Sequence, residues 1–237
     1  MDRTTHIEHL RADSATLVAA QRADPKAPAW AGLGWNRTAL LAHTAQVHGY
    51  ARAQIHAGPE RRIRFSDLAP TPTGDELPGL FEDGLVELAA LLSEMDVDAT
   101  WPTWAGPQPG TFFPRRMAQE TAVHRWDAAP EPIDAALGVD GIDELLDLFV
   151  PRLPADRLAG VSGTIHLHAT DAEGEWLVRF DDGAITVERA HAKGDLALRG
   201  DAGDLLLWAW NRVPVDERFE VFGNRALLEA WRTTVVF

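Results

Sequence analysis

The sequence predicts a protein in two parts, a four-helix bundle followed by a small α+β domain built on an antiparallel sheet. Apolar residues recur with helical period in the first part. The clearest series is Leu77, Phe81, Leu85, Leu88, Leu92 and Met95. The period changes to two in the second part, as in residues 164–170. A Pro- and Gly-containing stretch, residues 151–163, separates the two patterns, so we predict domains over 1–152 and 153–237.

The first part contains four long predicted helices, over residues 5–22, 36–56, 77–95 and 114–127, and a short one over 141–150. Asn36 is a good N-cap for the second of these helices. Pro25, Gly58-Pro59 and Pro130 end the first, second and fourth of these helices. Residues 60–74 and 101–110 are predicted as loops because they are rich in proline and other turn residues. These elements together favour a helical bundle.

The second part alternates strands and turns before it returns to helices. Strands are expected over residues 164–170, 175–180, 184–189 and 195–199, and Asp182-Gly183 is a hairpin turn signal. Two helices, over 201–211 and 224–232, are expected to pack on the sheet.

Composition narrows the classes of function. The 237 residues carry a formal net charge of -14, which argues against nucleic acid or an anionic membrane surface as a partner. No apolar run is long enough to span a bilayer and the N-terminal residues lack a signal-peptide pattern, so we expect a cytoplasmic protein. The sequence has no cysteine, which excludes disulfides, thiolate metal sites and a cysteine nucleophile. Any thiol used in its chemistry must therefore come from outside the chain.

Glu120 and His124 are the first candidate metal ligands, because a spacing of four places both on one face of a helix. A carboxylate and an imidazole can hold a divalent ion if a third ligand arrives from elsewhere. The ordinary alternative is a polar pair on the surface of an amphipathic helix. His43 points toward other helices, although an inward histidine is more often a hydrogen-bonded core residue, and spacing leaves this open. His166 and His168 share a strand face and could in principle chelate a metal, but such a pair more often lines the solvent-facing side of an edge hairpin.

Several short segments resemble a known family. The segment from Gly34 to His43 resembles the Gly-Trp-Thr…Leu-x-x-His segment of DinB-like metal-binding bundles. Residues 116–127 are similar to the Glu-x-x-x-His segment of one branch, the mycothiol-dependent maleylpyruvate isomerase family. Residues 139–144 and 167–171 are also typical of that branch, and the second half resembles its sterol-carrier-like C-terminal domain. Relatives usually read Cys-Pro-Gly-Trp where this chain has Gly-Leu-Gly-Trp at 32–35, which changes a loop and not a ligand.

The resemblance implies metal ligation by His43, Glu120 and His124. The expected cofactors are a divalent metal (zinc, with nickel or iron as other choices) and mycothiol. Two imidazoles and one carboxylate leave positions open, as in catalytic sites. Coordination would deprotonate a thiol, or it could activate a water instead. The implied activity is isomerisation or S-transfer on a small molecule, by a monomer or homodimer.

Two further residues are candidates for the chemistry. Arg212, which follows the apolar stretch of the helix over 201–211, could orient a carboxylated substrate, or it could simply be a cation favoured at a helix C-terminus. Asp127 could orient a ligand histidine or only end its helix, and Arg116 could pair with Glu120. Two other functions remain open. One is a thiol-independent metalloenzyme, either a hydrolase or an iron oxygenase. The other is a non-catalytic module that binds a small ligand.

Overall fold

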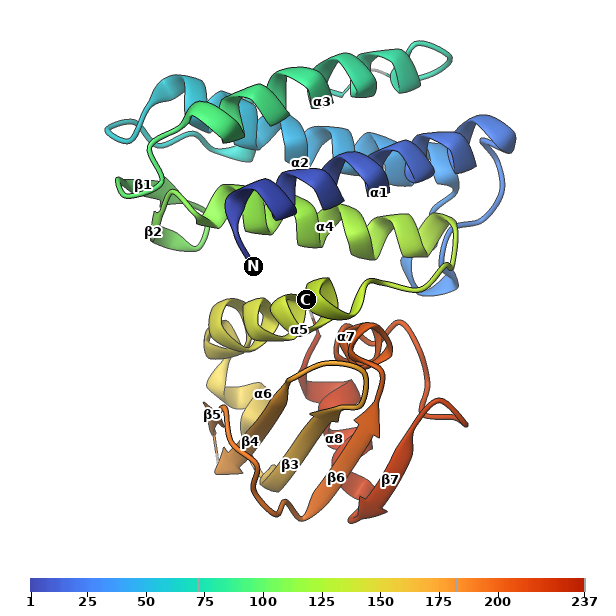
Figure 1. Cartoon of the computed structure of the whole chain (residues 1–237), viewed down its shortest axis with the longest axis vertical. Coiled ribbons are helices and arrows are strands. Elements are labelled where there is room, and N and C mark those ends of the chain that lie inside the picture. Colours follow the sequence, from blue (N-terminus) through green and yellow to red (C-terminus); the bar gives the residue numbers. More distant parts are fainter. Residues whose placement is uncertain (72, 182, 237) are drawn as a thin grey trace. The chain divides into compact units, whose positions relative to one another are not determined.

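The computed structural model describes residues 1–71, 73–181 and 183–236, which form two compact units, Met1–Glu131 and Pro132–Phe237. Figure 1 shows the helices and strands of each unit. The division comes earlier in the chain than the predicted boundary at 152, because helix α5 (Ala135–Glu144) packs within the second unit. Gly138 of α5 lies so close to α7 (Ala202–Ala209) that a β-carbon on it would meet the Ala202 carbonyl carbon at 2.7 Å.

The first unit confirms the predicted bundle. Its long helices are α1 (Arg3–Ala23), α2 (Arg37–Ala57), α3 (Leu77–Glu94) and α4 (Phe112–Ala128). The Asn36 side chain accepts from the Ala39 N–H at 2.8 Å, so the predicted N-cap of α2 is present. Leucines on facing helices, among them Leu17, Leu40 and Leu88, are fully buried and form the core. Short 3₁₀ turns, Ala31–Leu33 and Phe65–Asp67, interrupt the connections.

The predicted loop over 101–110 is a correction, because it contains a β-hairpin. Strand β1 (Thr100–Thr103) pairs antiparallel with β2 (Gly106–Pro109). Gly106 has a φ of 92°, the left-handed backbone that the turn requires. Trp101 is buried and its indole donates to the Asp96 carbonyl. Prolines in both strands hide the period of two in the sequence, which is why the strands were not predicted.

The second unit is a sheet with helices on one face. The strands are β3 (Ser162–Ala169), β4 (Glu175–Asp181), β5 (Ala184–Glu188), β6 (Leu196–Gly200) and β7 (Glu220–Gly223). Among the described residues their order is β5-β4-β3-β6-β7. The first four agree with the predicted strands within a few residues, and β7 was not predicted. Asp182 of the predicted hairpin turn lies outside the described residues.

One pairing makes the sheet mixed where the sequence predicted an antiparallel one. Strand β6 runs parallel to β3, with Leu167 opposite Leu198. Strands β3, β4 and β5 form a meander, and β6 then adds to the free side of β3. The connection from β5 to β6, residues 189–195, must therefore cross β4 and β3 to reach its new position. We call it the crossing segment.

Helices α7 and α8 (Ala226–Thr234) pack on this sheet, and α5 packs against α7. Trp231 of α8 is fully buried, stacks on Trp208 of α7 at 5.1 Å between ring centroids, and meets Phe180 of β4 edge-on. Residues 145–149 form a π-helical turn after α5, followed by a 3₁₀ turn at 150–152 and α6 (Ala155–Leu158). Among the described residues, no helix combines the length and the apolar character that crossing a membrane requires.

Candidate metal centre in the helical bundle

Helices α2 and α4 bring His43, Glu120 and His124 together. The Nε2 atom of His43 lies 3.1 Å from Glu120 Oε1, and the Nε2 atom of His124 lies 3.2 Å from the same oxygen. One nitrogen or oxygen from each residue falls within 4.8 Å of the other two. The imidazole rings are edge to face, with centroids 5.0 Å apart. The three predicted ligands therefore converge on one point, with their donor atoms turned inward.

Arg116 holds the second oxygen of Glu120. Its guanidinium donates to Glu120 Oε2 at 2.7 Å, one helical turn away, as the spacing suggested. Burial alone would raise the pKa of Glu120, but His124, His43 and Arg116 together hold it well below its usual range. The carboxylate is therefore an anion at neutral pH, with Oε1 facing the two imidazoles.

Asp127 fixes the orientation of His124. Its Oδ2 lies 2.8 Å from His124 Nδ1, and its side chain is completely buried. Burial works to lower the pKa of His124, but the carboxylates of Glu120 and Asp127 outweigh it and raise this pKa to about 9. With Nδ1 donating to Asp127, Nε2 is the nitrogen that faces Glu120. This carboxylate–histidine arrangement is the one that commonly orients metal-ligating histidines.

The side of the centre at His43 is the more open one. The His43 side chain is 36% exposed, against 9% for His124, so a small molecule could reach the centre past His43. The Trp35 ring lies 5.0 Å from the His43 ring. Gly34, with a φ of 67°, ends the 3₁₀ turn just before this tryptophan. The sequence analysis did not place Trp35 at the site, although Trp35 belongs to the segment from Gly34 to His43 that resembles the DinB-like bundles.

His48 is buried in the same bundle but belongs to a different arrangement. Its Nε2 lies 2.9 Å from Thr121 Oγ1, and that hydroxyl donates to the Met117 carbonyl. Within the described residues its Nδ1 has no hydrogen-bond partner. Burial lowers the pKa of His48 to about 4, so the ring is neutral. It lines a cavity of about 490 Å³ between α2 and α3, together with Phe81.

Arg212 belongs to the second unit and lies beyond the end of α7. Helix α7 closes with a Schellman arrangement, in which Asn211 takes a φ of 58° and the Arg212 N–H donates to the Leu207 carbonyl. The guanidinium donates to the Trp210 carbonyl at 3.1 Å. The structure thus shows the helix-terminus role that the sequence also allowed, and a substrate role for Arg212 remains a prediction.

The donor set of the centre fits a divalent metal. Two imidazole nitrogens and a carboxylate oxygen suit zinc, nickel or ferrous iron. A carboxylate held by Arg116 and an imidazole held by Asp127 leave the three donor atoms pointing inward. With three protein ligands, an ion here would keep a position open on the exposed side of His43, as catalytic sites do.

Comparison with known proteins agrees with this architecture. The family model for the mycothiol maleylpyruvate isomerase N-terminal domain matches residues 7–129, and the model for the MDMPI C-terminal domain matches residues 136–230. No curated protein matches the chain.

Two solved structures share the fold over nearly the whole length. A crystal structure of the mycothiol-dependent maleylpyruvate isomerase is 14% identical, with a TM-score of 0.64. A histidine-to-alanine mutant of that protein is 13% identical, with a TM-score of 0.66. In both cases 93% of each chain is covered. The predicted fold class is therefore confirmed. Since both domain models match in order and the first alone covers more than half of the sequence, the chain belongs to the mycothiol-dependent maleylpyruvate isomerase family.

Proposed function

We propose that the chain is a metal-dependent and mycothiol-dependent enzyme that isomerises, or transfers the thiol to, an electrophilic small molecule of the maleylpyruvate type. The observation that carries this proposal is the convergence of His43, Glu120 and His124 on one point, with Asp127 behind the second histidine. The family models support the thiol and the substrate class, because both domains carry that family's name.

The metal, when bound, would supply a positive charge that lowers the pKa of a thiol from its free value of ~8.5 and polarises a substrate carbonyl. The chain itself supplies no thiol, because it has no cysteine. The external sulfur would add to the cis double bond, the resulting single bond would rotate, and loss of the same thiol would give the trans isomer. No atom is gained or lost in this sequence. In an S-transferase, the carbon–sulfur bond would remain.

The protein's own contribution is orientation and charge. Asp127 keeps Nε2 of His124 turned toward the centre, and Arg116 keeps one oxygen of Glu120 away from it, so that the other faces inward. Glu120 brings a negative charge that offsets part of the charge of a divalent ion. The His43 side chain is 36% exposed, so the thiol would approach the centre from this side.

The direct test compares His43→Ala with His56→Ala. Both residues lie on α2, but His56 is exposed, and its partner at 2.7 Å is Glu87, which is not one of the predicted ligands. We expect His43→Ala to lose the metal of the bundle and the thiol-dependent turnover of maleylpyruvate, and His56→Ala to keep both. Each protein is prepared without chelator, and metal content is measured by elemental analysis.

Omission of mycothiol separates the remaining functions. The proposal predicts that turnover falls to the uncatalysed rate without thiol. Equal turnover without thiol would replace it with a thiol-independent metalloenzyme. A wild-type protein that binds no metal at the bundle and has no activity on electrophiles would favour a ligand-binding module.

A further inference from the structure

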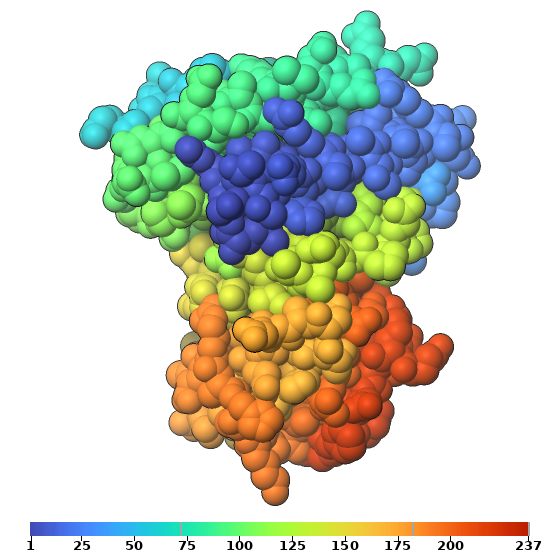
Figure 2. Space-filling view, in the orientation of Figure 1, coloured from blue at the N-terminus to red at the C-terminus, as the bar shows by residue number. Residues whose placement is uncertain are grey.

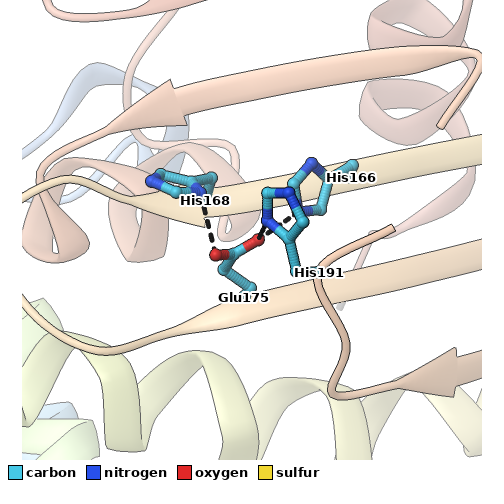
Figure 3. Close-up of side chains that lie close together, drawn as sticks. All are labelled: His166, His168, Glu175 and His191. Atoms are coloured by element: carbon cyan, nitrogen blue, oxygen red, sulfur yellow. Dashed lines mark hydrogen bonds and ion pairs between the residues drawn. The ribbon is translucent and has the colours of Figure 1, made fainter. Parts of the chain in front are cut away.

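The second unit holds another group of potential metal ligands, made of His166, His168, Glu175 and His191 (Figure 3). The Nε2 atom of His166 and the Nδ1 atom of His191 lie 2.8 and 2.6 Å from Glu175 Oε2. The Nδ1 atom of His168 lies 3.2 Å from the other oxygen, Oε1. One donor atom of each residue lies within 4.8 Å of those of the other three. We call this group the sheet cluster.

The sheet places three of these residues by its register. His166 and His168 are two apart on β3 and therefore project from one face. His168 is directly opposite Glu175 on β4, so the carboxylate projects from that same face. The apolar neighbours Ile165 and Leu167 project from the opposite face and are fully buried. The cluster thus lies on the sheet face turned away from the helices.

His191 comes from the crossing segment. The segment passes close to β3, as its glycine shows: a β-carbon on Gly194 would lie 2.9 Å from the backbone nitrogen of His166 and 3.2 Å from the Cβ of that residue. This close approach holds the backbone near the cluster, while the His191 side chain itself is 81% exposed. Figure 3 shows the His191 ring turned back toward Glu175 from this segment. Sequence reasoning considered only His166 and His168 as a possible chelating pair, and it missed the rest of the cluster because His191 lies far along the chain, between two strands.

The distances agree with what a tetrahedral metal needs. Ligands at about 2.0–2.1 Å from a zinc ion lie roughly 3.3 Å from one another in a tetrahedron. The carboxylate–imidazole separations are 2.6 and 2.8 Å at Oε2 and 3.2 Å at Oε1, shorter than that value by up to about 0.7 Å, and the four donor atoms lie within 4.8 Å of one another, so side-chain movements would bring them to it. The remaining adjustment falls mainly on the exposed His191. A hollow of about 560 Å³ lined by His166, His191 and Lys193 gives an ion a path from solvent.

We propose that His166, His168, Glu175 and His191 form a second divalent-metal site, of the zinc type, which fastens the crossing segment onto the sheet. Four protein ligands close such a site, as in structural zinc centres, whereas the three-ligand centre of the bundle stays open. Three neutral imidazoles and one carboxylate give the donor set that imidazole-binding metals such as zinc prefer. This inference concerns residues of the second unit and does not depend on the proposed function.

Zinc stoichiometry tests the site. Apo full-length protein is dialysed against a small excess of zinc, and bound metal is measured per chain. We expect about two zinc ions for the wild type, and about one for each of two double variants, His168→Ala/His191→Ala and His43→Ala/His124→Ala. A His168→Ala/His191→Ala protein that binds as much zinc as the wild type would overturn the second site. If only the His43→Ala/His124→Ala protein lost zinc, the second site would also be refuted, and zinc binding at the bundle centre would be supported.

Two single substitutions at exposed positions test the site without the risk that the protein fails to fold. His191→Ala and Lys193→Ala both change an exposed side chain of the crossing segment, but only histidine offers a ligand atom. In the His43→Ala/His124→Ala background, we expect His191→Ala to weaken zinc binding by at least about tenfold and Lys193→Ala to leave it unchanged. We also expect zinc to slow amide hydrogen exchange in residues 189–195 of the Lys193→Ala protein alone. Equal zinc affinity and equal exchange in the two variants would refute the proposal.

Discussion

Replacement of Asp127 by asparagine tests how the bundle centre orients His124. The carboxylate is completely buried and lies 2.8 Å from Nδ1 of that histidine. Asparagine has nearly the same size and can still accept the hydrogen bond, but it has no charge. Loss of such a partner typically weakens metal binding by about 10–100-fold, which corresponds to about 1.4–2.7 kcal/mol.

The same substitution also changes the proton that competes with the metal. Since the pKa of His124 is raised to about 9, this ring is largely protonated in the apo protein at pH 7, and metal binding must displace the proton. Asp127→Asn lowers this pKa because Asp127 is one of the groups that raise it. The loss of affinity should therefore be smaller at pH 7 than at pH 9, where competition by the proton is weak in both proteins.

The assay is competition with a chromophoric zinc chelator at both pH values, corrected for the chelator's own protonation. Asp13→Asn is the matched control, because Asp13 on α1 is also a largely buried carboxylate that pairs with α4, at 2.9 Å from Arg125, which is not one of the three predicted ligands. We expect unchanged zinc affinity for Asp13→Asn. An Asp127→Asn protein with wild-type affinity at pH 9 would refute the orienting role.

Three further predictions concern titration and packing. The wild-type zinc affinity of the bundle should rise about tenfold per pH unit from pH 7 to 9 and then level off, because His124 must lose its proton; an affinity independent of pH in chelator competition would contradict this. Glu120→Gln should lower the free energy of unfolding of the apo protein by about 3 kcal/mol in urea, because it removes the charge that pairs with buried Arg116 at 2.7 Å. The pKa of Glu120 is held well below its usual range in the folded protein, so its carboxylate stabilises the fold fully at pH values above the pKa of the unfolded chain, and this stabilisation is lost as the pH falls through the pKa of the folded protein. A Glu120→Gln protein as stable as wild type at pH 7 would argue against this contribution. Trp231→Ala should destabilise the second unit by about 3–5 kcal/mol, since the ring is fully buried and its indole donates to the Ala209 carbonyl, and an unfolding midpoint in urea unchanged from wild type would contradict that packing.

The helical bundle could be predicted from the sequence because its signals are local. A period of 3.6 defines the third helix, while the Asn36 N-cap and the Gly58-Pro59 step bound the second, all without reference to the rest of the chain. In Figure 2 atoms of α1, in dark blue, lie at the visible surface of the bundle, as expected for an amphipathic helix with one polar face. The meeting of Glu120 with His124 also follows from local spacing, whereas the approach of His43 needed the family resemblance.

The remaining features depend on contacts that the sequence does not display. The direction of β6 depends on where the crossing segment leads, and strands of either direction have the same alternation. The boundary at 131 depends on the close packing of Gly138 against α7, and nothing in the sequence distinguishes Gly138 from any other glycine. The sheet cluster needs the register of β3 with β4 and the path of His191 above them. These are all pairings between distant segments.

X-ray absorption at the zinc edge tests the central claim, that the bundle centre takes its thiol from outside the chain. The sample is the zinc-loaded His168→Ala/His191→Ala protein, so that only the bundle centre is filled, and spectra are taken with and without mycothiol. The chain has no cysteine, so sulfur at a zinc–thiolate distance of ~2.3 Å must come from the added thiol. We predict nitrogen and oxygen neighbours alone before the addition and one sulfur neighbour after it. A spectrum that mycothiol leaves unchanged, in a sample that still turns over maleylpyruvate, would contradict the account.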